Sequence, residues 1–119
     1  MTSRDIFLAR LQRGITPRAS VGSATSIVTT DLLERVRISF PDAHLEPEKM
    51  ARLAAAGHTE LGFDNVMPLF SVWHESAALG CDVDWGDNGR MPDGHARCSS
   101  IDDSISIPDG FLKEPGCAV

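Results

Sequence analysis

The sequence has only three cysteines among its 119 residues, and none of them belongs to a C-x-x-C pair. Cys81, Cys98 and Cys117 are odd in number and widely spaced. This pattern argues against both a disulfide framework and a zinc ribbon, since each needs cysteines in sets. We expect all three to be reduced thiols.

Clusters of positive charge and long apolar runs are also missing. Lys and Arg number 11 against 17 Asp and Glu, for a formal net charge of −6, and the basic residues are scattered. Nucleic-acid binding depends on neutralising phosphates with basic groups, so no such partner is expected. No apolar run approaches the ~20 residues that span a bilayer, and the N-terminus lacks the apolar block of a secretory signal. The sequence predicts a cytoplasmic protein without a membrane partner.

Apolar residues recur at helical spacing in four segments, over 2–13, 30–40, 47–61 and 73–79. The clearest is 47–61, which begins with a proline at the position where a missing amide hydrogen does no harm. Its predicted buried stripe is Met50, Leu53, Ala54, Gly57 and Leu61.

The ends of these helices are set by local signals. Thr2 and Asp5 have capping-box spacing, and Pro41 is expected to end the helix over 30–40. Two histidines lie beside the 47–61 helix: His44 is expected in a loop before it, and His58 on its flank.

Short strands are predicted between the helices, over 19–23, 63–67 and 81–85, with a turn at 86–89. Helix and strand alternate with little slack, which indicates an α/β fold. The loop after the first strand is rich in small residues that permit close approach of a ligand, so Ser23 and Thr25 are weak candidates for cofactor binding. The segment 90–119 is rich in Pro, Gly, Ser and Asp and is expected to be a loop or a poorly ordered tail.

One long run carries a resemblance to a known family, GFDNVMPLFSVWHESAALGCDVDWG, supported by the preceding FPDAHLEPEKMARLAAAGHTELGFD. It resembles the uroporphyrinogen decarboxylase superfamily, and more closely its cobamide-dependent methyltransferase branch, which moves a methyl group from a methylated corrinoid to a thiol such as coenzyme M. The resemblance implies a (β/α)8 (TIM) barrel, for which ~250 residues are typical. Residues 1–119 are therefore expected to be the N-terminal portion of an incomplete barrel.

The same resemblance suggests where a substrate pocket lies. Barrel enzymes bind substrate at the C-terminal ends of their strands, which makes Ser71, His74 and Glu75 candidate pocket-lining residues. In the decarboxylases, a catalytic aspartate precedes an A-L-G motif by a fixed interval, and the matching position here is Ser71. A neutral hydroxyl cannot supply the negative charge that stabilises a pyrrole cation, and the arginine-bearing motif of the decarboxylases also lacks a counterpart. Both departures favour the methyltransferase branch.

No metal site is expected in this chain. The resemblance implies that a His-x-Cys pair and a later Cys bind zinc in the C-terminal half of the family, where zinc activates the acceptor thiol. His95 and Cys98 have H-x-x-C spacing, which differs from that motif and is better explained as an ordinary loop pair. A calcium loop starting at Asp84 fails because Gly86 stands at its third position and His95 at its twelfth.

Three functions remain open at this point. The first is a portion of a corrinoid-dependent methyltransferase, with a methylcobamide substrate, a corrinoid protein as partner, and its zinc site lying outside the chain. The second is a uroporphyrinogen decarboxylase of porphyrin biosynthesis, which needs no cofactor. The third is a non-catalytic fragment that docks onto a partner or associates with itself through uncovered barrel edges. We expect the isolated chain to be inactive and to bind no zinc.

Overall fold

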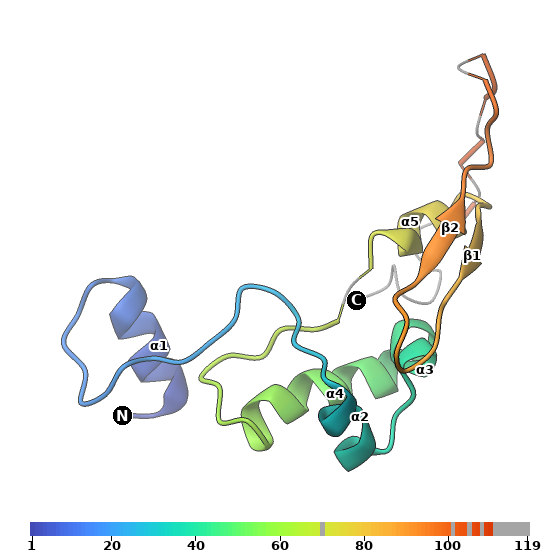
Figure 1. The fold of residues 1–119 in the computed structure, drawn as a ribbon. Coiled ribbons are helices and arrows are strands. Elements are labelled where there is room, and N and C mark those ends of the chain that lie inside the picture. Colours follow the sequence, from blue (N-terminus) through green and yellow to red (C-terminus); the bar gives the residue numbers. More distant parts are fainter. Residues whose placement is uncertain (70, 101, 105, 108, 111–119) are drawn as a thin grey trace.

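The computed structural model describes residues 1–69, 71–100, 102–104, 106–107 and 109–110. In these residues five helices and one two-stranded sheet follow an extended path, with α1 at one end and the β-hairpin at the other (Figure 1). The radius of gyration is 17.7 Å. A compact domain of this length is expected to have a radius of gyration of about 13 to 14 Å. The chain is therefore an elongated body.

Helix α1 spans Ser3–Leu11 and begins with the predicted capping box. The backbone N–H of Asp5 donates to Thr2 Oγ1 at 3.2 Å, and the N–H of Thr2 donates to Asp5 Oδ2 at 2.9 Å. Ile6 is the buried residue of this helix, while Leu8 and Leu11 are exposed. Local capping therefore defines α1 better than core packing does.

The single helix predicted over 30–40 is wrong, because two helices occupy this region. Helix α2 spans Thr30–Val36 and ends at Arg37, whose φ of 55° is left-handed. Helix α3 spans Phe40–Leu45 and begins where the prediction placed an end, since a proline in the first turn loses no helical hydrogen bond. Ser39 caps it by accepting from the backbone N–H of Asp42 at 3.2 Å.

Helix α4 spans Pro47–Thr59, in agreement with the predicted segment, and forms the centre of the core. Helices α2 and α3 pack against it. The stripe prediction is confirmed for Met50 and Leu53 but is wrong for Leu61, which is 43% exposed because the helix ends before it. The buried core consists of Leu32, Leu33, Ile38, Phe40, Ala43, Met50, Leu53, Ala56 and Leu69.

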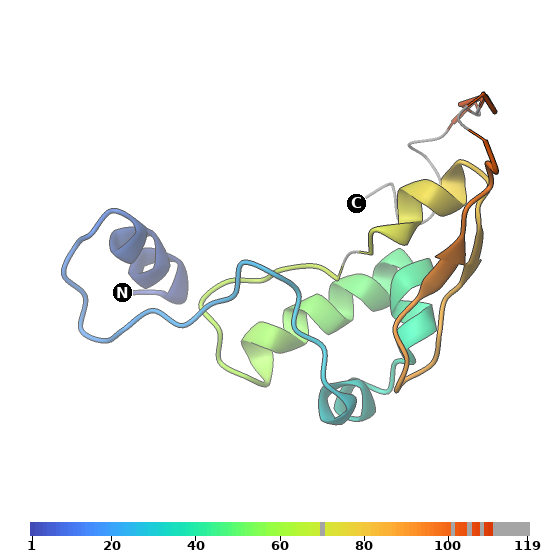
Figure 2. The same ribbon diagram turned by 45° about the horizontal axis from the view of Figure 1, so that its top comes forward.

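The strands predicted over 19–23 and 63–67 lie side by side but form no regular ladder, so both strand predictions are wrong. The two segments run together between α1 and α4 (Figure 2), and the backbone N–H of Asp64 donates to the carbonyl of Val21 at 2.7 Å. Side chains take the other partners that a ladder would need. Asn65 donates to the carbonyl of Ser23 at 2.7 Å and accepts from its N–H at 3.0 Å.

The far end of the molecule consists of α5, which spans Trp73–Ala78, and a hairpin of β1 (Asp82–Asp84) and β2 (Asp93–His95). The strands are antiparallel, with Asp82 opposite His95. Helix α5 and β1 match the predicted segments, whereas β2 lies in the part of 90–119 for which a loop was expected. It is a strand because it pairs with β1, and local composition does not predict such a pairing. The expectation for 101, 105, 108 and 111–119, including Cys117, lies outside the described residues.

Candidate functional site

A pocket of about 340 Å³ lies where the hairpin turn crosses to α2 and α3. Its floor is apolar and is formed by Leu33, Phe40 and Leu69, all of them buried. The turn is held in place by Asn88, whose Oδ1 accepts from the backbone N–H of Phe40 at 2.7 Å. This bond joins residues 48 positions apart, so it fixes one wall of the pocket relative to its floor.

The polar wall of this pocket carries hydroxyl, amide and guanidinium groups. Thr29 is the N-cap of α2, and its Oγ1 accepts from the N–H of Leu32 at 3.2 Å. Arg90 pairs with Asp84 at 2.7 Å and approaches Asp87 at 3.8 Å. The hydrogen bond from Arg90 is the main reason that the pKa of the Asp84 carboxyl lies below its ordinary value. Asp84 and Asp87 do not line the pocket themselves, but they pair the charge of Arg90, which does.

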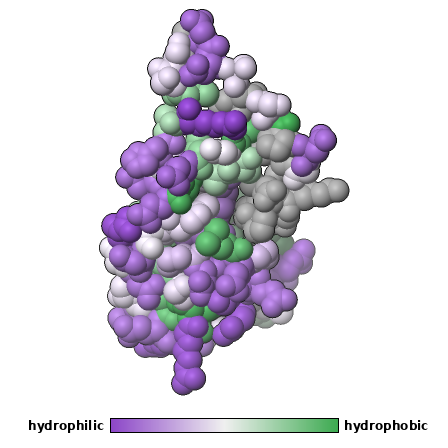
Figure 3. Space-filling view, turned by 90° about the vertical axis from the view of Figure 1, so that its right-hand side faces the viewer, coloured by the Kyte–Doolittle hydropathy of each residue, from purple (hydrophilic) through white to green (hydrophobic). Residues whose placement is uncertain are grey.

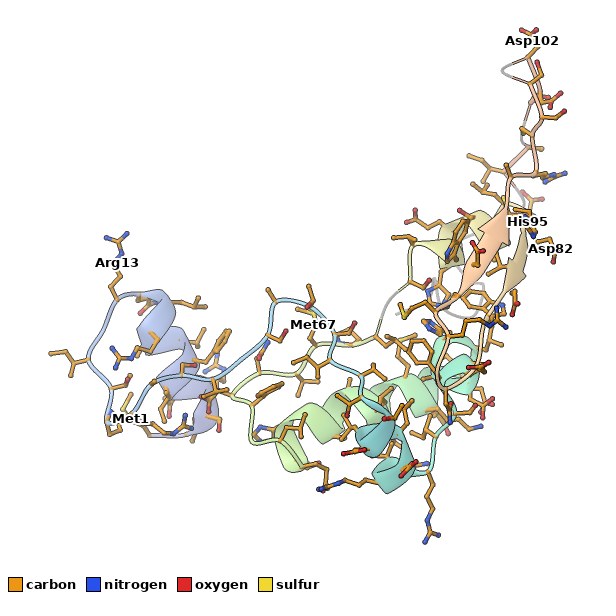
Figure 4. All side chains as sticks on the ribbon, viewed as in Figure 1. Met1, Arg13, Met67, Asp82, His95 and Asp102 are labelled. Carbon is orange, nitrogen blue, oxygen red and sulfur yellow. The ribbon has the colours of Figure 1, made fainter. Side chains whose placement is uncertain are left out.

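A second pocket, of about 470 Å³, lies between α1 and the paired segments 18–25 and 63–67. Phe7 and Leu11 line it from α1, and Gly22 and Ser23 line it from the first segment. The backbone is close here: a Cβ on Gly22 would lie 2.5 Å from the Oδ1 of Asn65. Met67, labelled in Figure 4, also lines this pocket from the second segment.

An ion pair joins the two segments beside that pocket. The Asp64 carboxylate accepts from both terminal nitrogens of Arg18, at 2.7 and 2.6 Å, and from the backbone N–H of Val21 at 3.0 Å. Its side chain has a relative accessibility of 0%. The bond from Arg18, followed by that from Val21, holds the pKa of Asp64 well below its usual range. A bidentate pair of this kind is directional, so it fixes how the segments align.

Two histidines meet between α3 and α5. His74 is buried, and its Nε2 lies 2.9 Å from the carbonyl oxygen of His44. His44 is buried too, and neither of its ring nitrogens has a partner in the described part of the chain. Its ring centroid lies 4.7 Å from that of Phe40 and 5.6 Å from that of Trp85. Burial, with a smaller effect of His74, lowers the pKa of His44 to about 4, so the ring is neutral near pH 7.

The prediction that His44 lies in a loop is therefore wrong. It lies on α3, and its ring is enclosed by aromatic neighbours. Pro41 and Pro47, three residues before and after His44, suggested a loop, but the first turn of α3 accommodates Pro41 without losing a helical hydrogen bond.

The sequence-predicted pocket residues do not gather at either pocket. Ser71 is half-buried, and its Oγ accepts from the backbone N–H of Trp73 at 3.2 Å, next to the start of α5. His74 packs into the interior beside His44, and Glu75 is exposed. The face around α5 and the hairpin is mostly hydrophilic, with small hydrophobic groups between (Figure 3). The three candidates thus occupy three different environments.

The two weaker candidates lie nearer to a cavity. Ser23 lines the second pocket, and its hydroxyl lies 3.4 Å from that of Thr25. Both residues also border a much smaller cavity of about 10 Å³ between the paired segments and α4.

No three His, Cys, Asp or Glu side chains within the described residues are arranged to hold a metal ion. His95 is exposed on β2 opposite Asp82, as Figure 4 shows, and Cys98 lies beyond the strand and is half-buried. The first pocket, beside the hairpin turn, therefore offers hydrogen-bonding groups around an apolar floor.

Most of the groups that build these sites could not be predicted from local sequence patterns. Arg18 and Asp64 are separated by 46 positions, and Asn88 is visible in the sequence only as a turn residue. The one available signal for Asp64 was a charged residue directly after Phe63 in a segment predicted to be a strand, where burial would require a partner.

Comparisons with known proteins identify the family. The family model described as Uroporphyrinogen decarboxylase (URO-D) matches residues 2–115. A methylcobamide:CoM methyltransferase of Methanosarcina acetivorans is 38% identical over 68 residues, which are 57% of this chain and 20% of the relative. A methylated-thiol–coenzyme M methyltransferase of Methanosarcina mazei is 38% identical over 88 residues, 74% of this chain and 23% of the relative. A methylcobamide:CoM methyltransferase of Methanosarcina barkeri is 30% identical over 91 residues, 76% of this chain and 27% of the relative.

A solved structure supports the same assignment. A methyltransferase from Methanosarcina mazei superposes with a TM-score of 0.78 and 27% identity, covering 99% of this chain and 35% of that one. The chain spans about a fifth to a quarter of the length of the curated relatives it matches. No helix in the described residues offers the long apolar stretch that a membrane crossing requires. The chain belongs to the uroporphyrinogen decarboxylase family, and methylcobamide:CoM methyltransferases are among its relatives.

Proposed function

We propose that this chain is the N-terminal portion of a corrinoid-dependent methyltransferase, which moves a methyl group from a methylcobamide to a thiol and works with a corrinoid protein. The observation that carries the proposal is the set of relatives, which are named as methyltransferases acting with coenzyme M. The superposition of almost the whole chain on part of a methyltransferase supports the proposal that its helices and paired segments belong to a larger (β/α)8 barrel.

Position 71 argues against decarboxylation as the activity. A decarboxylase of this family needs a carboxylate there, and Ser71 instead offers a hydroxyl that accepts from the N–H of Trp73. The side chain thus stabilises the start of α5 and carries no charge. A developing pyrrole cation would find no counter-charge at this position.

The proposal assigns no zinc chemistry to the residues that the structure describes. The described residues provide no group of three metal-binding side chains, and His95 and Cys98 do not fit the family's zinc ligands. We attribute thiol activation to residues outside the chain, and we assign no step of it to residues within it.

A chimaera tests the proposed activity. Residues 1–119 would replace the matched part of the Methanosarcina mazei methyltransferase, and methyl transfer from methylcobalamin to coenzyme M would be followed by the change in the visible spectrum of the corrinoid. We expect transfer by the chimaera and no loss of carboxyl groups from uroporphyrinogen. A folded chimaera that decarboxylates uroporphyrinogen and transfers no methyl group would overturn the proposal.

The elongated shape favours a second candidate, a non-catalytic chain that docks onto a partner. Large apolar side chains remain exposed on the paired segments, including Val21 at 49% and Val66 at 52%. Apolar surface of this kind is covered in a stable assembly, either by the rest of a barrel or by another chain. The test is to add the chain, as a separate polypeptide, to the relative lacking its matched part. If methyl transfer is restored, the chain both docks onto a partner and contributes to the methyltransferase.

A further inference from the structure

In the pocket between α2 and the hairpin turn, three lining side chains, those of Asn88, Thr29 and Arg90, are left to donate hydrogen bonds. The Oδ1 of Asn88 is engaged by the N–H of Phe40, so the Nδ2 amino group is the part of this side chain that remains for a ligand. The Oγ1 of Thr29 accepts from Leu32, which directs the hydroxyl hydrogen elsewhere. Arg90 has donors only. The wall therefore suits a ligand atom that accepts.

The charges beside the pocket restrict the chemical class of ligand further. Arg90 is already paired with Asp84 and lies near Asp87, so its guanidinium charge is not free to pair with a ligand. An anionic ligand would therefore find no unpaired cation among the described lining residues. The apolar floor of Leu33 and Phe40 would in turn disfavour a charged end. An uncharged carbonyl on an apolar stem accepts from the wall, needs no cation, and can pack its stem on the apolar floor.

We infer that this pocket is a receptor for a carboxamide group on a short apolar stem. Its carbonyl oxygen accepts from the Nδ2 of Asn88, and its amino group donates to the hydroxyls of Ser26 and Thr30, which also line the pocket. The stem lies on the apolar floor. The volume of about 340 Å³ is at the lower end of the range for small-molecule sites.

Two sources could supply this chemistry. One is a free small amide, and the other is a carboxamide arm of the kind that surrounds the corrin ring of a cobamide. The second source rests on the proposed methyltransferase function, whereas the pocket chemistry does not. The experiment therefore probes each source separately.

The test uses the full 119-residue chain labelled with ¹⁵N and titrated with butyramide, with butyrate as its charged isostere. We expect butyramide to shift the side-chain amide resonances of Asn88 and the backbone amides of Leu33 and Phe40. Butyrate should leave them in place. Asn88→Asp keeps the acceptor for the Phe40 N–H but loses the donor, so it should weaken butyramide binding by about tenfold or more. Gln12→Glu makes the same amide-to-acid change at the exposed C-cap of α1 and should bind as the wild type does.

Equal shifts with butyrate and butyramide, or unchanged butyramide binding by a folded Asn88→Asp variant, would overturn the inference. The comparison of butyramide with butyrate on the wild type tests the preference for a carboxamide even where the Asn88→Asp variant does not fold. Dicyanocobinamide is then titrated to test the corrinoid source. Binding of butyramide alone would support the carboxamide site and exclude the cobamide as its source. Methyl transfer by the chimaera is measured independently, so failure of either proposal is distinguishable from failure of the other.

Discussion

Asp64 combines a fully covered carboxylate with hydrogen bonds from Arg18, Ser20 and the backbone of Val21. A carboxylate without solvent is stable only while its charge is paired, and the bidentate guanidinium provides that pairing. The alignment of the segments 18–25 and 63–67, and with it the second pocket, therefore depends on this side chain together with the hydrogen bonds between Asn65 and Ser23.

Replacing Asp64 by Asn should lower the melting temperature by on the order of 10 °C, because the Arg18 guanidinium loses its counter-charge in a partly buried site. Differential scanning fluorimetry measures the change. Glu60→Gln provides the control, since Glu60 forms an exposed pair with Arg35 at 3.9 Å and its loss should shift the melting temperature by only about 1 to 2 °C. Equal changes in melting temperature for the two variants would show that the Arg18–Asp64 pair stabilises the fold no more than the exposed pair does.

His44 should make stability depend on pH. Its pKa is lowered from 6.5 to about 4 in the folded chain, so the unfolded chain takes up a proton first as the pH falls. The contribution of neutral His44 to the free energy of unfolding is fully present above pH 6.5, and it is lost as the pH falls from 6.5 to about 4. We expect His44→Phe, which keeps an aromatic ring beside Phe40 and Trp85, to lose much of this decline. Thermal melts across that range test this, and parallel profiles for the two proteins would contradict it.

Among the secondary-structure elements, those with complete local signals were predicted correctly. The capping box of Thr2 and Asp5 marks α1, and the apolar spacing around Met50 marks α4, because both signals act within a few residues. The segments 19–23 and 63–67 were predicted to be strands from composition, and the structure pairs them through side chains. Whether such a segment forms a regular ladder depends on residues distant in the sequence, and no local pattern predicts those contacts.

The candidate site was predicted less well than the helices. Ser23 lines the second pocket, and its role in cofactor binding stays a prediction. His74 was expected at a pocket and is packed against His44 instead, because the helical face of α5 that turns inward is set by the partner helix α3. Asn88 could not be found from the sequence, since its role depends on a contact with α3 across 48 positions.

The hairpin depends on one glycine in its turn. Gly86 has a φ of +77°, and a Cβ there would lie only 2.2 Å from the carbonyl oxygen of Arg90. Gly86→Ala should therefore disrupt the turn and release Asn88 from α3. Gly89→Ala is the matched control, since its nearest neighbour would be a side-chain oxygen of Asp87 at 3.6 Å. Hydrogen exchange of the Phe40 amide, which Asn88 protects, should accelerate in the first variant and stay near the wild-type rate in the second.

At the scale of the whole molecule, the described core covers only part of the chain. The buried cluster is built from α2, α3, α4, Ile38 and Leu69, while α1 and the paired segments extend away from it (Figure 1). The extent of 57 Å along the longest axis against 22 Å along the shortest is consistent with a body that packs against further polypeptide. Large apolar side chains exposed on the paired segments make that contact favourable.

We therefore expect the isolated chain to associate with itself as its concentration rises, through Val21 and Val66 on the paired segments. Val21→Lys combined with Val66→Lys should reduce the association, since each lysine places a hydrated charge where apolar contact is needed. Ala51→Lys combined with Ala55→Lys adds the same charge on the exposed side of α4 and controls for net charge. Sedimentation velocity over a range of concentrations distinguishes these cases. A wild-type chain that remains a compact monomer throughout, or equal loss of association in both double variants, would rule out the paired segments as the contact surface.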